Sequence, residues 1–204
     1  LNINAAFRHY SNGKLNMPNN GMNFPVIGLG LRYVPEPEKV EFKPFNGTSE
    51  IDQRIYFNVM GSMSWREVLK EDFKHKAYSI STYASRQVSK YNTLLVGIDG
   101  FYYDDESVKR ATNVHIAKNP GESQDQSLDG RQLALTLGSE LLLGELSLIL
   151  QGGIYLYKPQ PYYANWYQRY GFKYNVTNFS FAQVTLKAHS RTADMMEFGI
   201  GFRI

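Results

Sequence analysis

A possible nucleophile and its possible base stand at the end of the first alternating stretch of the chain. His9 and Ser11 are two residues apart, and a strand places residues i and i+2 on the same face. A histidine can take the proton of a serine hydroxyl, and a serine activated in this way attacks carbonyl groups. The same face carries apolar residues, namely Leu1, Ile3, Ala5 and Phe7. The pair therefore faces the core in a soluble protein and faces lipid in a membrane barrel.

Alternation of apolar and polar residues recurs along the chain and predicts the elements that hold this pair. The clearest stretches are residues 131–142 and 145–157, which a tight turn at Leu143-Gly144 joins. Weaker or shorter stretches cover residues 1–10, 26–33, 55–65, 76–90, 94–102, 170–177, 180–189 and 195–204. We expect about ten strands, most of them long enough for the ~9–11 residues that a tilted transmembrane strand needs.

The composition excludes several classes of protein. A net charge of +3, without a stripe of basic residues, is too mild to indicate a nucleic-acid partner. The chain has no cysteine, which excludes disulfides and thiolate chemistry, and its histidines are scattered, so no metal or cofactor is expected. The mean hydropathy is −0.40, and no apolar run approaches the ~20 residues of a membrane helix. Strands that alternate give such mild polarity even when they cross a membrane.

The polar faces of the predicted strands favour a membrane barrel. They carry Gly, Ser, Asn, Gln and Tyr with isolated charges such as Arg32 and Asp99, as a hydrated lumen does. Aromatic residues gather at strand ends, as in an interfacial girdle. A soluble sandwich or lipocalin-like barrel is the alternative. We therefore expect an all-β fold, an antiparallel up-and-down transmembrane β-barrel in which residues 1–204 form a single outer-membrane domain. Because the chain begins within an apparent strand, further strands of a longer barrel are expected upstream.

Loop lengths orient this barrel. Counted back from the C-terminus, short turns fall on the periplasmic side, near residues 90–91, 143–144 and 177–178. Longer connections fall outside, at residues 67–75, 104–130 and 158–169. The connection 35–52 breaks this rule, because it is long, acidic and proline-rich but periplasmic. Continuing this alternation of periplasmic and outer connections toward the N-terminus places His9 and Ser11 at the outer end of their strand.

Charged and tyrosine side chains outside the first strand are assigned to the rim or the lumen. The rim is expected to hold basic residues, namely Lys158, Arg169, Lys173 and Arg191. The lumen is expected to hold Tyr56, Tyr155, Tyr157, Arg32 and Glu145. Glu140 and Glu145 are expected to pair with Lys or Arg inside it.

The segment from Arg8 to Asn23 resembles a known signature. Arg8-His9-Tyr10-Ser11-Asn12-Gly13, followed by Pro18-Asn19-Asn20-Gly21-Met22-Asn23, is similar to the His-x-Ser-Asn…Pro-Asn-x-Gly pattern of the lipid A 3-O-deacylase (PagL-like) outer-membrane barrels. The closing run from Leu186 to Ile204 resembles the end of the longer, Bacteroidetes-type members, the acyloxyacyl hydrolases. The specific motif covers residues 8–23 alone, and the rest of the chain resembles the family in its strand pattern.

The resemblance implies a serine esterase of the bacterial outer membrane that removes an ester-linked acyl chain from lipid A of lipopolysaccharide. Ser11 would be the nucleophile and His9 its general base. Oxyanion stabilisation would fall to Asn12, Gly13 and Asn19. The family's third member is a glutamate on the next strand, and the matching position here is Asn23. An asparagine can orient a histidine tautomer, but it cannot stabilise the imidazolium by charge.

Two other functions compete with the esterase. Because Asn23 replaces the acid, the main alternative is a catalytically inactive structural or accessory subunit, whose partners would be proteins of an envelope complex. The other is a small porin, although the expected lumen residues look more like filling than an open channel. Without the flanking motif, His9 and Ser11 would be polar residues beside a turn rich in Asn and Gly.

Overall fold

The structure is a computed structural model of the chain. The residues that it describes are 2–10, 21–31, 51–66, 74–119, 121, 128–160, 164–190 and 192–204. Within β1, the side chain of His9 lies outside the description.

The described residues form ten strands and one helix. In chain order these are β1 (Asn2–Tyr10), β2 (Met22–Gly30), β3 (Ile55–Arg66), β4 (His75–Ser89), β5 (Asn92–Tyr103), α1 (Asp105–Lys118), β6 (Arg131–Leu143), β7 (Leu146–Tyr157), β8 (Trp166–Asn175), β9 (Ser180–His189) and β10 (Thr192–Arg203). The β6–β7 turn is Gly144-Glu145, where Gly144 has a φ of +78°, in the left-handed region that favours glycine. The predicted all-β class and the strand count are confirmed.

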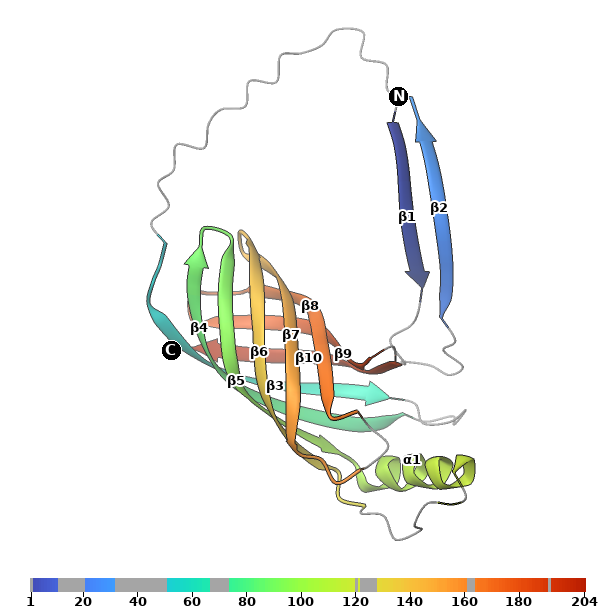
Figure 1. Ribbon diagram of the computed structural model, residues 1–204. Coiled ribbons are helices and arrows are strands. Elements are labelled where there is room, and N and C mark those ends of the chain that lie inside the picture. Colours follow the sequence, from blue (N-terminus) through green and yellow to red (C-terminus); the bar gives the residue numbers. More distant parts are fainter. Residues whose placement is uncertain are drawn as a thin grey trace, which may run out of the picture.

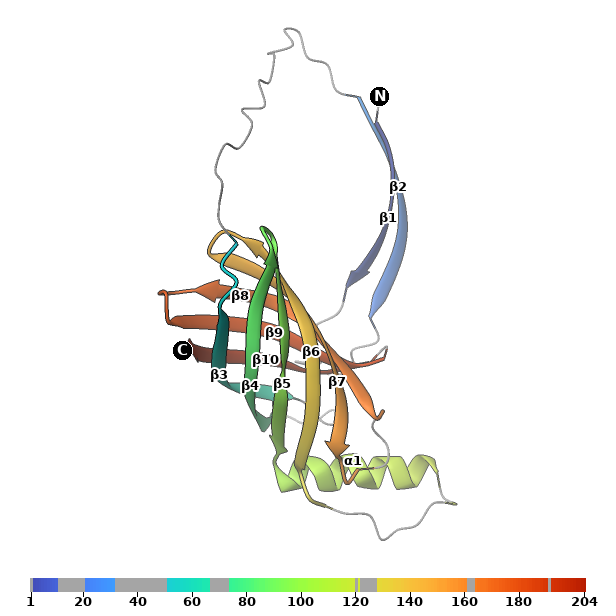
Figure 2. The same cartoon turned by 60° about the vertical axis from the view of Figure 1, so that its left-hand side comes forward.

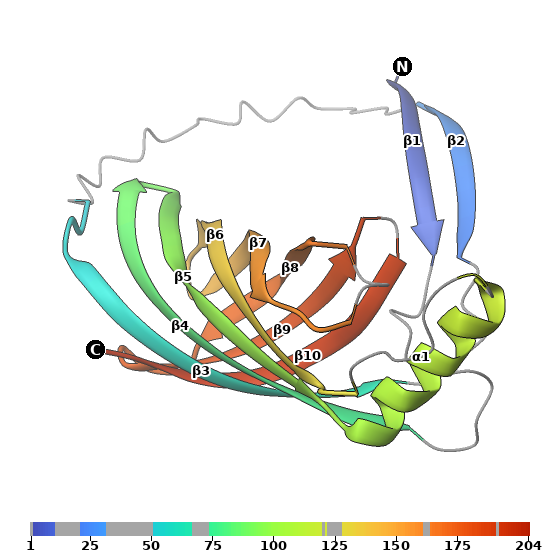
Figure 3. The same cartoon turned by 60° about the horizontal axis from the view of Figure 1, so that its bottom comes forward.

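Eight of the ten strands close into one antiparallel barrel. Strands β3 to β10 each pair with their neighbours in sequence, and β10 then pairs with β3 to complete the ring. Strands β1 and β2 form a separate two-stranded sheet, which is not part of the barrel wall (Figures 1 and 3). The single wall of about ten strands that the alternation predicts is thus divided into a closed barrel and a hairpin.

The barrel is polar inside and apolar outside. Leu137 and Ile200 expose 66% and 67% of their surface on the outer wall, whereas Asp99 and Arg169 expose 0% and 1% inside. Large apolar side chains point outward from all eight barrel strands, from Phe57 in β3 to Phe202 in β10. A soluble barrel would bury these residues, so this surface is that of a transmembrane barrel. Among the described residues, no helix is long and apolar enough to cross a membrane.

The two ends of the barrel differ. One, the short-turn end, holds the turns at residues 90–91, 144–145 and 176–179. The other, the long-loop end, holds helix α1, which follows β5 (Figure 2). The helix begins where the side chain of Asp104 accepts a hydrogen bond of 2.9 Å from the backbone N–H of Ser107. Exposed aromatic residues lie near both ends, with Tyr102 and Trp166 at the long-loop end and Tyr91 and Phe179 at the short-turn end.

Close strand packing leaves no room for a side chain at Gly171 in the barrel wall. A Cβ added at Gly171 in β8 would overlap the backbone carbonyl of Val184 in β9, whereas a Cβ added at Gly61 in β3 would meet nothing within 4 Å. We expect Gly171→Ala to lower the free energy of unfolding by about 1–3 kcal/mol because backbone must move. Gly61→Ala, the matched control, should leave stability unchanged or slightly raised. Urea unfolding in detergent, followed by the mobility shift of the folded barrel, measures both, and equal stability of the two variants would contradict the packing.

Candidate functional site

The hairpin β1–β2 places the matched motif positions opposite each other. In its antiparallel register His9 faces Asn23 directly, and the preceding pair on that face is Phe7 with Pro25. Residues opposite in register lie on the same face of a sheet. The backbone register therefore puts Asn23 opposite His9.

The face that holds His9 and Asn23 is otherwise apolar. Its further cross-strand pairs are Ala5 with Ile27 and Ile3 with Leu29. Phe7 and Ile27 expose 70% and 80% of their surface, so the described barrel does not cover this face. On the opposite face the rings of Tyr10 and Phe24 meet edge to face with centroids 5.9 Å apart.

The remaining positions of the predicted site lie outside the described residues. These are Ser11 and the predicted oxyanion residues, Asn12, Gly13 and Asn19. Asn23 is described and exposed. The catalytic roles of all five, and that of His9, remain predictions.

A second concentration of polar groups fills the barrel lumen, centred on Arg169 of β8. Its Nη1 donates to Asp99 Oδ2 at 2.8 Å, and its Nε donates to Glu197 Oε2 at 2.6 Å. Tyr167 also donates its hydroxyl to Asp99. Each of the three charged side chains is buried. One guanidinium thus neutralises two carboxylates, from β5 and β10, across the interior of the barrel.

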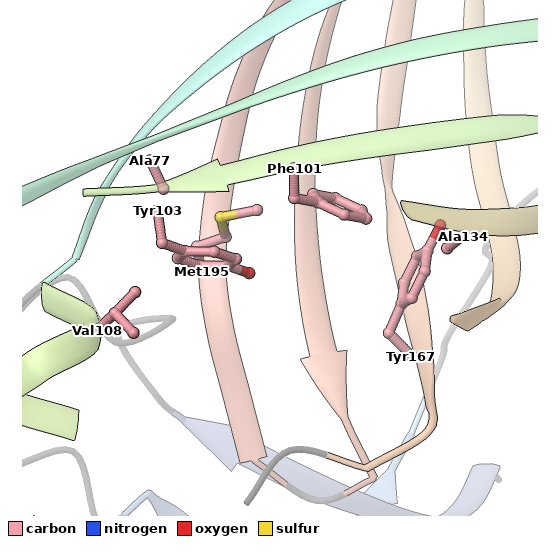
Figure 4. Packing of buried hydrophobic residues seen from close by; sticks show 7 residues of the cluster. All are labelled: Ala77, Phe101, Tyr103, Val108, Ala134, Tyr167 and Met195. Carbon is pink, nitrogen blue, oxygen red and sulfur yellow. The ribbon is translucent and has the colours of Figure 1, made fainter. Parts of the chain in front are cut away.

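A second carboxylate centre lies toward the long-loop end. Asp194 Oδ2 accepts hydrogen bonds from the Tyr103 hydroxyl at 2.5 Å and from Lys187 Nζ at 2.8 Å, and Arg66 Nη1 donates to its Oδ1 at 3.3 Å. The Lys187 ammonium also lies 4.3–5.5 Å from four ring centroids, those of Phe101, Tyr103, Tyr155 and Tyr167. Figure 4 shows the apolar side of this packing, with Met195 beside Tyr103 and Tyr167 beside Ala134. Cation–π contacts and an ion pair together hold a buried ammonium here.

Two basic residues expected at the rim belong to this lumen instead. Arg169 and Lys173 are buried, and Lys173 Nζ donates to Glu140, which confirms the predicted lumen pairing of that glutamate. For Arg169 the rim assignment was wrong because β8 begins at Trp166, four residues before the predicted start. Lys173 already lay within the predicted strand 170–177, on the face that points into the lumen. Alternation continued back from Tyr170 places Arg169 inward, so the signal was present in the sequence.

Two residues predicted to lie in the lumen are outside it. Glu145 stands in the β6–β7 turn and accepts a hydrogen bond of 2.9 Å from the Tyr174 hydroxyl. Tyr157 is exposed at the end of β7 and donates to Asp129 Oδ2 at 2.8 Å. The pKa of Asp129 is lowered because its carboxylate accepts hydrogen bonds from the backbone N–H of Arg131 and then from Tyr157.

The chemistry available to the two regions differs. An eight-stranded barrel has room inside for little more than side chains, and here ion pairs and aromatic rings occupy it. In the described part of the chain, no group of three or more His, Cys, Asp or Glu could hold a metal ion. The lumen is therefore filled by paired charges and aromatic rings, whereas the hairpin carries the predicted site residues.

Comparison with known proteins finds one family for the barrel. A family model described as acyloxyacyl hydrolase, C-terminal domain, matches residues 53–204, which span β3 to β10 and leave out the hairpin. No curated protein matches the chain. A solved structure from work titled "De novo design of transmembrane beta-barrels" is 14% identical with a TM-score of 0.41, and the alignment covers 76% of this chain and 98% of that one.

Proposed function

The chain belongs to the PagL-like acyloxyacyl hydrolase family, and we propose that it is an outer-membrane serine esterase that removes an ester-linked acyl chain from lipid A of lipopolysaccharide. The observation that carries the proposal is the register of the hairpin, in which His9 stands opposite Asn23 at the end of an exposed apolar face. Such a face suits a substrate that is itself a membrane lipid.

In the proposed reaction, Ser11 Oγ attacks the carbonyl carbon of the ester while His9 accepts its proton. Asn12, Gly13 and Asn19 would donate hydrogen bonds to the oxyanion of the tetrahedral intermediate. When the intermediate collapses, His9 returns the proton to the departing sugar oxygen, and the acyl group remains on Ser11. Water, with His9 again as the base, then releases the fatty acid and restores the serine.

The apolar face explains how the substrate would reach this site. Acyl chains of lipid A lie against the outer surface of a barrel in the same leaflet. The pairs Phe7 with Pro25 and Ala5 with Ile27 would contact such a chain beside the reacting ester. Because the substrate already lies in the membrane, the site needs no lid.

Asn23 supplies a sharp test of the proposed roles. We expect Asn23→Glu to raise the rate of acyl release by about tenfold or more, because a carboxylate opposite His9 stabilises the imidazolium that forms in the transition state. Initial rates on purified lipopolysaccharide, with the released fatty acid measured by mass spectrometry, give the comparison.

Asn4→Glu is the matched control, since it adds the same charge to β1 on the opposite face of the hairpin. It should leave the rate unchanged. An equal rise in both variants would show that negative charge on the hairpin, rather than a carboxylate beside His9, is responsible.

The second candidate function is an inactive accessory subunit of an envelope complex, and Asn23 in place of the acid favours it. The two functions differ in the lipid A of cells that make the protein. The esterase predicts a lipid A species lighter by one acyl chain, whereas the accessory subunit predicts no change in acylation. Mass spectrometry of lipid A from cells with and without the protein separates them.

A further inference from the structure

Among the described strands, the hairpin has two edges that pair with no other strand. In the described structure β1 pairs with β2, and neither strand pairs with the barrel. Both strands have 9 residues, the length of a tilted transmembrane strand. Unpaired backbone N–H and C=O groups cost several kcal/mol each in hydrocarbon, so strands cross a membrane only in closed barrels. A hairpin with this apolar face therefore needs further strands on both sides.

The described barrel does not supply those strands, because its wall is complete. Strand β10 pairs with β3 from Phe198 opposite Met63 to Arg203 opposite Asn58. Beyond that ladder, Phe57 and Ile204 exchange both of their backbone hydrogen bonds, at 2.9 and 2.8 Å. Insertion of the hairpin between β10 and β3 would break all of these bonds.

The connection between hairpin and barrel also indicates two units. Residues 31–54 join β2 to β3 and contain Pro35, Pro37 and Pro44 with several glutamates. This composition is typical of a linker between domains, and a periplasmic connection within one barrel is usually short. The family match supports the same division, since it begins at residue 53 and its description is that of a C-terminal domain.

We propose that β1 and β2 belong to a second barrel, whose other strands come from a part of the protein outside residues 1–204, and that residues 31–54 link the two barrels in tandem. The edges of the hairpin are then paired in the second barrel. The pairing of β10 with β3, called the seam below, stays closed. The inference rests on strand pairing and is independent of the proposed function. Its consequence for that function is that His9 and Ser11 lie on the wall of the second barrel.

Cross-linking in the full-length protein tests the seam. Because residues 1–204 contain no cysteine, the pair Val59→Cys and Phe202→Cys, which are opposite in the β3–β10 register, forms the disulfide expected of neighbouring strands. We expect this disulfide to form in nearly all of the folded protein in the outer membrane. Phe202→Cys combined with a cysteine at Ile3, Ala5 or Phe7 of β1 should give none. The reverse result would place the hairpin in the seam and overturn the proposal.

Cleavage of the linker tests the second barrel. A protease site inserted after Gly47 of the full-length protein is cut after extraction into mild detergent. We expect two fragments that separate on size exclusion, each still shifting in electrophoretic mobility on heating as folded barrels do, with one copy of the chain in the hairpin-bearing fragment. Fragments that stay together until they unfold would show one common barrel. Two copies in the hairpin-bearing fragment would show that a second molecule completes it, and either result overturns the proposal without any measurement of activity.

Discussion

Replacement of Ser11 by alanine is expected to lower acyl release from lipopolysaccharide by about 10⁴-fold or more, which is the scale of loss when a serine nucleophile is removed. The loss has a direct cause, since alanine has no oxygen to attack the ester carbonyl or to carry the acyl group. The measurement is the initial rate of fatty-acid release by purified protein in detergent with lipopolysaccharide.

The control for this experiment is Ser89→Ala, which removes an exposed serine hydroxyl at the short-turn end of β4. It should retain full activity. Both variants should keep the electrophoretic mobility shift of a folded barrel, because each removes a single hydroxyl group and leaves the ion pairs of the lumen unchanged. Acyl release by Ser11→Ala at the wild-type rate would rule out Ser11 as the nucleophile.

The largest expected effect on stability is that of Arg169→Met. Removal of this guanidinium leaves two buried carboxylates, Asp99 and Glu197, without their shared cation. Breaking a buried ion pair by removing one partner costs about 3–5 kcal/mol, so we expect a loss of that size in the free energy of unfolding. Urea unfolding of the barrel in detergent measures it.

Two further variants show whether charge is the cause. Arg54→Met removes an arginine that is also paired with an aspartate but is exposed just before β3, and it should leave the free energy of unfolding almost unchanged. Adding Asp99→Asn and Glu197→Gln to Arg169→Met should recover much of the lost stability, since no unpaired charge is then buried. A triple variant as unstable as Arg169→Met would show that packing of the guanidinium, and not its charge, holds the lumen.

Alternation in the sequence predicted the strands well because each barrel strand has one face in lipid and one in the lumen. The predicted strand 180–189 has the observed bounds, and 131–142 differs from β6 by one residue. Alternation along a strand does not reveal which other strands pair with its two edges. The hairpin strands and the barrel strands share the same pattern, so the closure of β10 on β3 without the hairpin could not be read from it.

The helix after β5 shows a different limit. Helix α1 buries just Ser107, Val108 and Thr112, so its apolar periodicity is weak. The signal that could have found it is its start, where Asp104 caps the helix and Asp105 and Glu106 occupy the first turn. A loop interpretation of residues 104–130 missed that cap.

The face of β2 on which Asn23 lies could be predicted, because alternate residues of a strand point to opposite faces and a count along the strand is enough. The sequence placed it in line with Pro25 and Ile27, and the register adds that His9 is its direct partner. The ion pairs of the lumen could be predicted as charges on the polar face, but not as partners. Arg169 joins β8 to β5 and β10, and that choice depends on how the closed barrel brings distant strands together.

Covalent labelling tests most directly whether Ser11 acts as an activated nucleophile in an outer-membrane esterase. A lipophilic fluorophosphonate bonds covalently to activated serines, and mass spectrometry of the digested protein locates the modified residue. We predict an adduct on Ser11 in the wild-type protein, loss of acyl release in proportion to labelling, and no adduct in His9→Gln. Acyl release that continues after complete labelling, or an adduct on another serine that tracks the loss of activity, would contradict the proposed role of Ser11.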